Sequence, residues 1–183
     1  MKKYFIQYKP FLLFLAKFFI PYIVLALIYQ GFLSFLGENE IDSITTLVAE
    51  NTKQLLTVFN ADAAIVKNDS ESYVRLIYNQ HYVARMIEGC NGISVIILFI
   101  SFVVSFSGKM KPTLFFILGG SLVIYVLNVA RIASLCVLLY HFPKQEQILH
   151  GAFFPLFIYG VVFILWVIWV NKFSLYAKNT TDS

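Results

Sequence analysis

The apolar run from Thr113 to Tyr140 constrains the fold of this chain most, because its only charged residue is Arg131. A helix rises ~1.5 Å per residue, so this run is longer than the ~30 Å hydrocarbon core of a bilayer requires. Hydrophobic residues make up 59% of the whole chain and charged residues 13%, about half of the charged share typical of soluble domains. The sequence therefore predicts an integral membrane protein.

Hydropathy divides the chain into four apolar runs and one long polar segment. The four membrane spans are expected at residues 14–35, 91–107, 113–140 and 150–170. Residues 37–89 separate the first two spans and contain no run long enough to cross a bilayer. We therefore expect an all-α polytopic protein forming a single membrane domain over residues 1–183, with a small extracytoplasmic α+β cap between the first two spans.

Lysines mark one side of the membrane. They lie at the N-terminus, between the second and third predicted spans, and in the C-terminal tail: Lys2, Lys3, Lys9, Lys109, Lys111, Lys172 and Lys178. Because loops rich in lysine stay in the cytoplasm, both termini are predicted to be cytoplasmic. The lysines flank apolar segments instead of forming a patch, so the net charge of +4 gives no indication of nucleic-acid binding.

The segment 37–89 contains eight of the ten acidic residues. A helical period after Asp42-Ser43 predicts an N-capped helix with Ile44, Leu47, Val48, Leu55 and Val58 on its apolar face. Two short strands are expected at 73–78 and 81–87, on either side of Asn79-Gln80. A helix followed by a two-stranded ribbon would thus form the cap and lead the chain to Cys90.

The pentapeptide Glu88-Gly89-Cys90-Asn91-Gly92 joins the cap to the second predicted span. The two glycines allow a tight turn and a close approach of another backbone to the sulfur. If a helix begins just after Cys90, its free N–H groups and positive dipole end favour the thiolate. The alternative is a linker cysteine at a strand-to-helix turn.

Three reactive side chains are predicted to meet at the outer face of the membrane. Cys90 begins the second span, and His150 begins the fourth. Arg131 lies 18 residues after Thr113, which places it ~27 Å up a core of ~30 Å. Asn128, one helical turn before Arg131, could orient the guanidinium. Such a set suffices for acyl transfer: a thiolate attacks an amide, an imidazole protonates the leaving amine, and a guanidinium stabilises the oxyanion.

Each candidate also has a structural explanation. Arg131 could extend to lipid headgroups, and His150 could cap its helix. Cys136 is interpreted as a packing residue, although a disulfide between Cys90 and Cys136 is possible outside the cytoplasm. We expect His81 and His141 to be solvated loop residues, and we expect neither a metal ion nor another cofactor.

These motifs resemble the exosortase/archaeosortase family. Cys90 followed by Gly92, Asn128 followed by Arg131 within a membrane helix, and His150 at the start of the next helix are similar to the three family motifs in order and spacing. The likeness covers about residues 85–170 and is strongest to the short exosortase F-like form found in Bacteroidetes. The chain has roughly half the usual number of spans.

The resemblance implies a sortase-like cysteine protease or transpeptidase in the bacterial cytoplasmic membrane, acting on its periplasmic side. Cys90 would be the nucleophile, Arg131 the oxyanion or carboxamide partner and His150 the acid/base, with Asn128 and Gly92 in supporting positions. Substrates would be membrane-anchored proteins whose C-terminal signal consists of a short motif, a helix and a basic tail.

Two other readings remain open. The chain could be a non-enzymatic membrane subunit of a surface-polymer or secretion assembly, in which Cys90 and Arg131 are structural. It could also be a membrane thiol–disulfide enzyme, although no second cysteine lies near Cys90 in the sequence.

Overall fold

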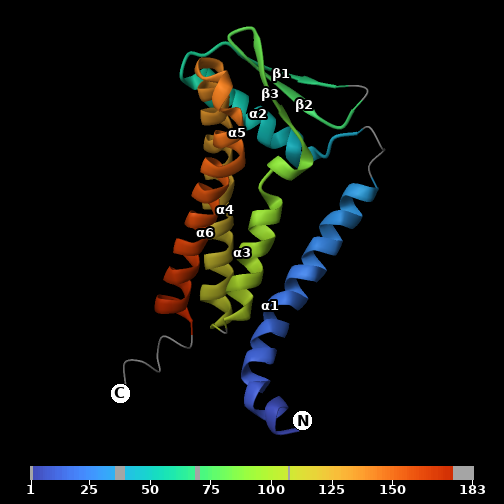
Figure 1. The fold of residues 1–183 in the computed structure, drawn as a ribbon, viewed down its shortest axis with the longest axis vertical. Coiled ribbons are helices and arrows are strands. Elements are labelled where there is room, and N and C mark those ends of the chain that lie inside the picture. Colours follow the sequence, from blue (N-terminus) through green and yellow to red (C-terminus); the bar gives the residue numbers. More distant parts are fainter. Residues whose placement is uncertain (1, 36–39, 69–70, 107, 175–183) are drawn as a thin grey trace.

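A computed structural model describes residues 2–35, 40–68, 71–106 and 108–174 of the protein. The described chain is mostly helical, with a three-stranded sheet at one end of a bundle of helices (Figure 1). The prediction of a polytopic helical protein with a small α+β cap is therefore supported in outline.

Among the residues that the structure describes, three helical segments are long and apolar enough to cross a membrane: Phe11–Ser34, Met110–His141 and Pro143–Phe173. The first is part of α1 (Lys2–Ser34), and the second is α4 (Met110–His141). The third is a continuous series of helical turns: η2 (Pro143–Gln145), α5 (Glu146–Ile148), η3 (Leu149–Phe153), α6 (Phe154–Ile168) and η4 (Trp169–Phe173). The predicted spans at 113–140 and 150–170 lie within these helices, and the span at 14–35 extends one residue beyond α1.

The second predicted span, 91–107, corresponds to a shorter helix, α3 (Ile93–Ser105). Its 13 residues are ~20 Å long, less than the ~30 Å of a hydrocarbon core. By length, three of the four expected spans are thus supported, and the count of four stays a prediction. α3 begins later than expected because Gly92 adopts a left-handed conformation (φ 83°) just before it.

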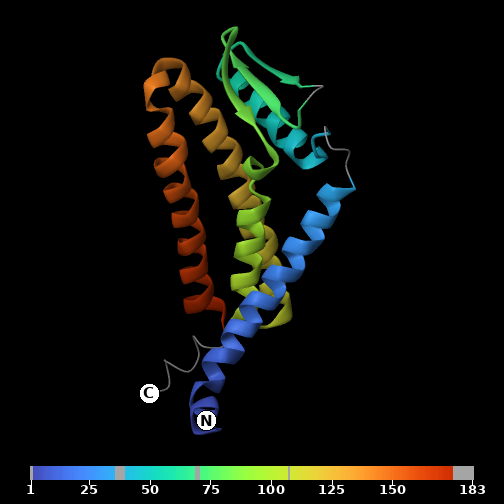
Figure 2. The ribbon, with the colours of Figure 1, turned by 45° about the vertical axis from the view of Figure 1, so that its right-hand side comes forward.

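α3 packs against α1 and α4, and all three helices can be followed in Figures 1 and 2. Phe18 of α1 packs on Phe102 of α3 with ring centroids 4.6 Å apart. On the α4 side, Gly120 faces the ring of Phe99, which a Cβ at that position would overlap. The small residue therefore allows α4 to approach α3 closely.

The cap begins with α2 (Ser43–Val58), and the predicted N-cap is confirmed, since Asp42 accepts a hydrogen bond from Thr45 N–H at 2.8 Å. Three strands follow: β1 (Ala63–Lys67), β2 (Val74–Tyr78) and β3 (His81–Met86). They form an antiparallel sheet in the order β1-β2-β3. Between β2 and β3, Asn79 and Gln80 both have positive φ, as a two-residue type I′ turn requires.

The prediction of a two-stranded ribbon was wrong in one respect, because β1 adds a third strand. The sequence of β1, Ala-Ala-Ile-Val-Lys, has no clear alternation of apolar and polar residues. Its pairing with β2 therefore depends on tertiary contacts.

One hydrophobic core joins the cap to the C-terminal half of α4. It contains these buried residues of α2, β2, β3 and α4: Val48, Ala49, Leu56, Val74, Leu76, Met86, Val129, Ile132, Ala133 and Cys136. Cys136 is fully buried there, and both cysteines are free, so the possible Cys90–Cys136 disulfide is not formed. The core fixes the sheet against the helix that contains Asn128 and Arg131.

Candidate active site

Cys90 lies where the sheet meets the helix bundle. β3 ends at Met86, and the short 3₁₀ turn η1 (Glu88–Cys90) follows it. The Cys90 N–H donates to the carbonyl of Ile87 at 2.9 Å, which closes this turn. Cys90 is partly buried, and α3 begins three residues later at Ile93. The predicted position at a loop-to-helix junction is therefore observed.

The side chain of Asn91 forms hydrogen bonds with residues of three helices, α1, α2 and α3. Its side-chain amide donates to the hydroxyl of Tyr29 in α1 at 2.6 Å and to that of Thr45 in α2 at 3.1 Å. Its side-chain oxygen accepts from Ile93 N–H at 3.0 Å, which caps the start of α3. Asn91 is buried, so these bonds hold the residue after the cysteine in one position. Sequence reasoning assigned Asn91 no role.

Position 92 requires a glycine because of its backbone conformation and because of the space around it. Its φ of 83° is a conformation that residues with a Cβ rarely adopt. A Cβ at this position would also lie 3.1 Å from Cγ of Asn128. The glycine therefore allows the start of α3 to approach Asn128 of α4 closely, and its supporting role in the site stays a prediction.

Asn128 connects the cysteine loop to the arginine. Its side-chain amide donates to the carbonyl oxygen of Cys90 at 2.9 Å. Its side-chain oxygen accepts from Nη1 of Arg131 at 3.3 Å, so Asn128 orients Arg131 as the spacing predicted. Asn128 is almost fully buried, and its two hydrogen bonds connect the Cys90 loop with Arg131.

The guanidinium of Arg131 has an unused donor. Its Nε is buried and has no hydrogen-bond partner among the residues that the structure describes. A buried donor without a partner costs ~1–3 kcal/mol and needs an explanation. A guanidinium carries five N–H donors, so with Nε buried here a developing oxyanion would have to meet one of the other N–H groups of Arg131.

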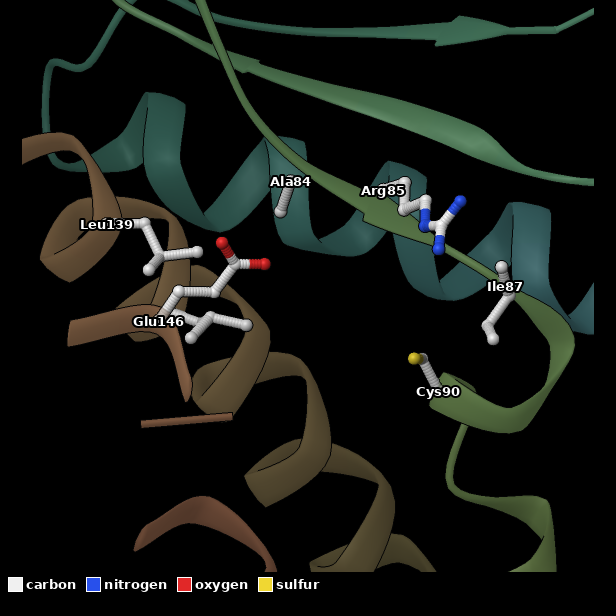
Figure 3. Close-up of a pocket in the computed structure, with 7 residues that line it drawn as sticks. Ala84, Arg85, Ile87, Cys90, Leu139 and Glu146 are labelled. Carbon is white, nitrogen blue, oxygen red and sulfur yellow. The ribbon is translucent and has the colours of Figure 1, made fainter. Parts of the chain in front are cut away.

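A cavity of about 200 Å³ borders Cys90 (Figure 3). Its lining comprises Ala84, Arg85, Ile87, Cys90, Leu135, Leu139 and Glu146, so Arg131 is not part of its wall. In Figure 3, Cys90 and Glu146 project into this space from opposite sides, and Arg85 lies above Cys90. Sequence reasoning missed Arg85 and Glu146. Arg85 could have been identified from its place on the strand that leads to Cys90. Glu146 could have been identified as the only acidic residue between the third and fourth predicted spans.

His150 is placed by its backbone alone. It lies in η3, and its side chain is outside the part of the chain that the structure describes. Glu146 precedes it by four residues and reaches the cavity beside Cys90. The structure therefore unites Cys90, Gly92, Asn128 and Arg131, and the role of His150 stays a prediction.

Burial affects the ionisation of Glu88, the acidic residue two positions before Cys90. Burial raises the pKa of Glu88, and the negative charge of Asp42 raises it further. Glu88 is therefore ionised less readily than an exposed glutamate, which lessens its repulsion of a thiolate two residues away. Among the described residues, no group of three histidine, cysteine or acidic side chains could hold a metal ion. His81 and His141 are exposed, as expected.

Fold and site together define a polytopic membrane protein that presents a cysteine, an asparagine and an arginine at one end of its helix bundle. Residues 11–172 match the family described as "Transmembrane exosortase (Exosortase_EpsH)". The chain belongs to the exosortase family, whose members are generally cysteine peptidases. No curated protein and no solved structure matches the chain significantly.

Proposed function

We propose that this protein is a sortase-like cysteine peptidase and transpeptidase that cleaves the C-terminal sorting signals of surface-destined proteins. The observation that supports this most is the pair of hydrogen bonds at Asn128, which donates to the Cys90 carbonyl and accepts from Arg131 and so connects the two. A purely structural arginine would not need to be oriented toward the cysteine loop by a buried amide. We further propose that the chain is of the exosortase F-like form.

In the proposed reaction, the Cys90 thiolate attacks the scissile carbonyl, and Arg131 stabilises the negative charge that develops on its oxygen. The C–N bond then breaks, and the protonated His150 donates a proton to the leaving amine. A thioester joins Cys90 to the N-terminal part of the substrate. Water or a surface acceptor gives its proton to His150 and attacks the thioester, which releases this part and regenerates the Cys90 thiolate and the protonated His150.

The proposed location is the cytoplasmic membrane of a bacterium, with both chain termini in the cytoplasm and the active site on the periplasmic side. Lysines at the predicted cytoplasmic ends support this orientation. The substrates are membrane-anchored proteins that end in a short motif, an apolar helix and a basic tail. Their helix would lie in the bilayer, so that the motif emerges at the level of Cys90.

The experiment uses a tagged reporter whose C-terminal signal is taken from a host protein with this arrangement. Cells without the enzyme, with the parental enzyme or with Cys90→Ser are compared for full-length and cleaved reporter. We expect cleavage with the parental enzyme only, at equal enzyme levels in the membrane. Equal cleavage with Cys90→Ser would favour the non-enzymatic subunit instead.

A further inference from the structure

The edge of the sheet next to the active site is open. β3 is the last strand in the order β1-β2-β3, so within the described part of the chain only one of its edges is paired. Among the described residues, no backbone hydrogen bond joins β3 to α4 or to the helical turns after α4. In an antiparallel pair, alternate residues direct their N–H and C=O groups away from the partner strand, and at an edge these groups can pair with another chain.

A groove follows this open edge down to the cysteine. A cavity of about 540 Å³ borders the first half of β3, at His81, Tyr82 and Val83. The 200 Å³ cavity borders the second half and ends at Cys90. Leu139 and Glu146 line both cavities, so the two lie next to each other between β3 and the end of α4.

The direction of β3 matches the path that a substrate must take. β3 runs from its hairpin turn, at the far end of the cap, toward η1 and the helix bundle (Figures 1 and 2). A substrate anchored by a C-terminal membrane helix also runs from the outer side toward the bilayer. Its residues before the scissile bond would therefore run parallel to β3.

We propose that the substrate's recognition segment binds as an added strand, parallel to β3, with its last residue delivered to Cys90. This inference rests on the proposed function and identifies how the same site selects its substrate. Backbone pairing gives such a strand its register, and the groove selects its alternate side chains. β3 has six residues and a bulge at Val83, so an added strand would pair with it on either side of that residue.

Charge at the inner end of the groove gives a basis for selectivity. Arg85 and Glu146 line the part of the groove that contains Cys90. Within the described residues, neither of them takes part in an ion pair. Their charged groups are therefore available to polar groups of the substrate just before the scissile bond, while Leu135 and Leu139 offer apolar contact.

Site-specific photo-cross-linking tests the location. The full-length Cys90→Ser enzyme, in membranes with the reporter, has Tyr82 replaced by p-benzoyl-phenylalanine. The matched control replaces Val66, which is on β1 at the opposite edge of the sheet and is similarly exposed (45% against 58% for Tyr82). We expect the reporter to cross-link at position 82 and not at 66. Absence of a cross-link at 82, or equal cross-linking at both positions, would overturn the proposal.

Backbone methylation tests strand pairing. Peptides of the recognition segment, each with one N-methylated amide, are offered to the reconstituted parental enzyme. We expect N-methylation of alternate amides to slow cleavage roughly tenfold, because the N–H groups of these amides pair with β3. Methylation of the other amides should leave the cleavage rate near that of the unmodified peptide. Cleavage that is equally fast for all peptides would overturn strand addition and leave the peptidase function intact. Conversely, a cross-link at 82 without any cleavage by the parental enzyme would contradict the peptidase function and leave the docking groove supported.

Discussion

The side-chain amide of Asn128 donates a hydrogen bond to the carbonyl oxygen of Cys90, 2.9 Å away. The same side chain accepts from Arg131, so one buried residue of α4 sets the position of the cysteine loop and of the guanidinium. Several of the proposed properties of the site depend on this pair of bonds.

Asn128→Ala is expected to reduce cleavage at least about tenfold, because it leaves the Cys90 carbonyl without its partner, a loss of ~1–3 kcal/mol. The measurement is reporter cleavage normalised to the amount of folded enzyme. Asn51→Ala is the matched control, since the Asn51 amide also donates to a residue of α4, the Tyr125 hydroxyl, at 2.6 Å. The control should lower thermal stability but keep near-parental cleavage. Equal cleavage by the two variants would refute the role of Asn128.

Gly92→Ala is expected to destabilise the protein and slow cleavage. A left-handed conformation costs a residue with a Cβ ~1–2 kcal/mol, and the added methyl group would also displace Asn128. Gly89→Ala is the control, because no heavy atom lies within 4 Å of a Cβ at that position. Thermal unfolding in detergent and reporter cleavage distinguish the two variants. Indistinguishable behaviour would show that the close approach of α3 and α4 does not matter.

Arg131→Lys separates catalysis from membrane anchoring. A lysine can extend to headgroups as well as an arginine, but it offers one mobile charge instead of a planar set of directed donors. We expect normal insertion and cleavage at least about a hundredfold slower, in line with the loss of an oxyanion donor in other acyl-transfer enzymes. The assay is cleavage of the tagged reporter per amount of enzyme in the membrane. Near-parental cleavage would assign Arg131 to lipid anchoring.

Glu88→Gln should stabilise the protein in a pH-dependent way. The folded state raises the pKa of Glu88 above its ordinary value of 4.5, mainly by burial, so it favours the protonated carboxyl. That contribution to stability is complete below about pH 4.5 and is lost as the pH rises through the raised pKa. The melting temperatures of variant and parent should therefore agree near pH 4, and the variant should melt higher at pH 7. A constant difference across this range would contradict the assignment.

Sequence reasoning identified the parts of the site that depend on local spacing. Asn128 and Arg131 are one helical turn apart, so their contact follows from the helix itself. The bond from Asn128 to the Cys90 carbonyl joins residues 38 positions apart, and it depends on how α3 packs against α4. The hydrogen bond from Asn91 to Tyr29, 62 positions away, likewise depends on how α1 packs at this junction. Neither contact has a local signature in the sequence.

In the fold, too, local patterns in the sequence predicted some features, while others depend on contacts between distant residues. Hydropathy indicated the long helices, but it did not reveal that α3 begins only at Ile93. The left-handed Gly92 precedes this residue, and Asn91, which accepts from Ile93 N–H, is held by tertiary hydrogen bonds to Tyr29 and Thr45. β2 and β3 were predicted from their own residues and turn. Arg85 and Glu146 reach the same cavity from β3 and α5, a proximity that local patterns do not encode.

The central claim is that Cys90 forms a thioester with the substrate, and hydroxylamine trapping tests it most directly. The parental enzyme cleaves the reporter in the presence of hydroxylamine, and mass spectrometry identifies the new C-terminus of the N-terminal fragment. Cys90→Ser is compared with Cys136→Ser, which removes the other, buried thiol. We predict a hydroxamate with the parental enzyme and with Cys136→Ser, and no product with Cys90→Ser. A fragment that ends only in a free carboxylate, formed equally by Cys90→Ser, would contradict the account.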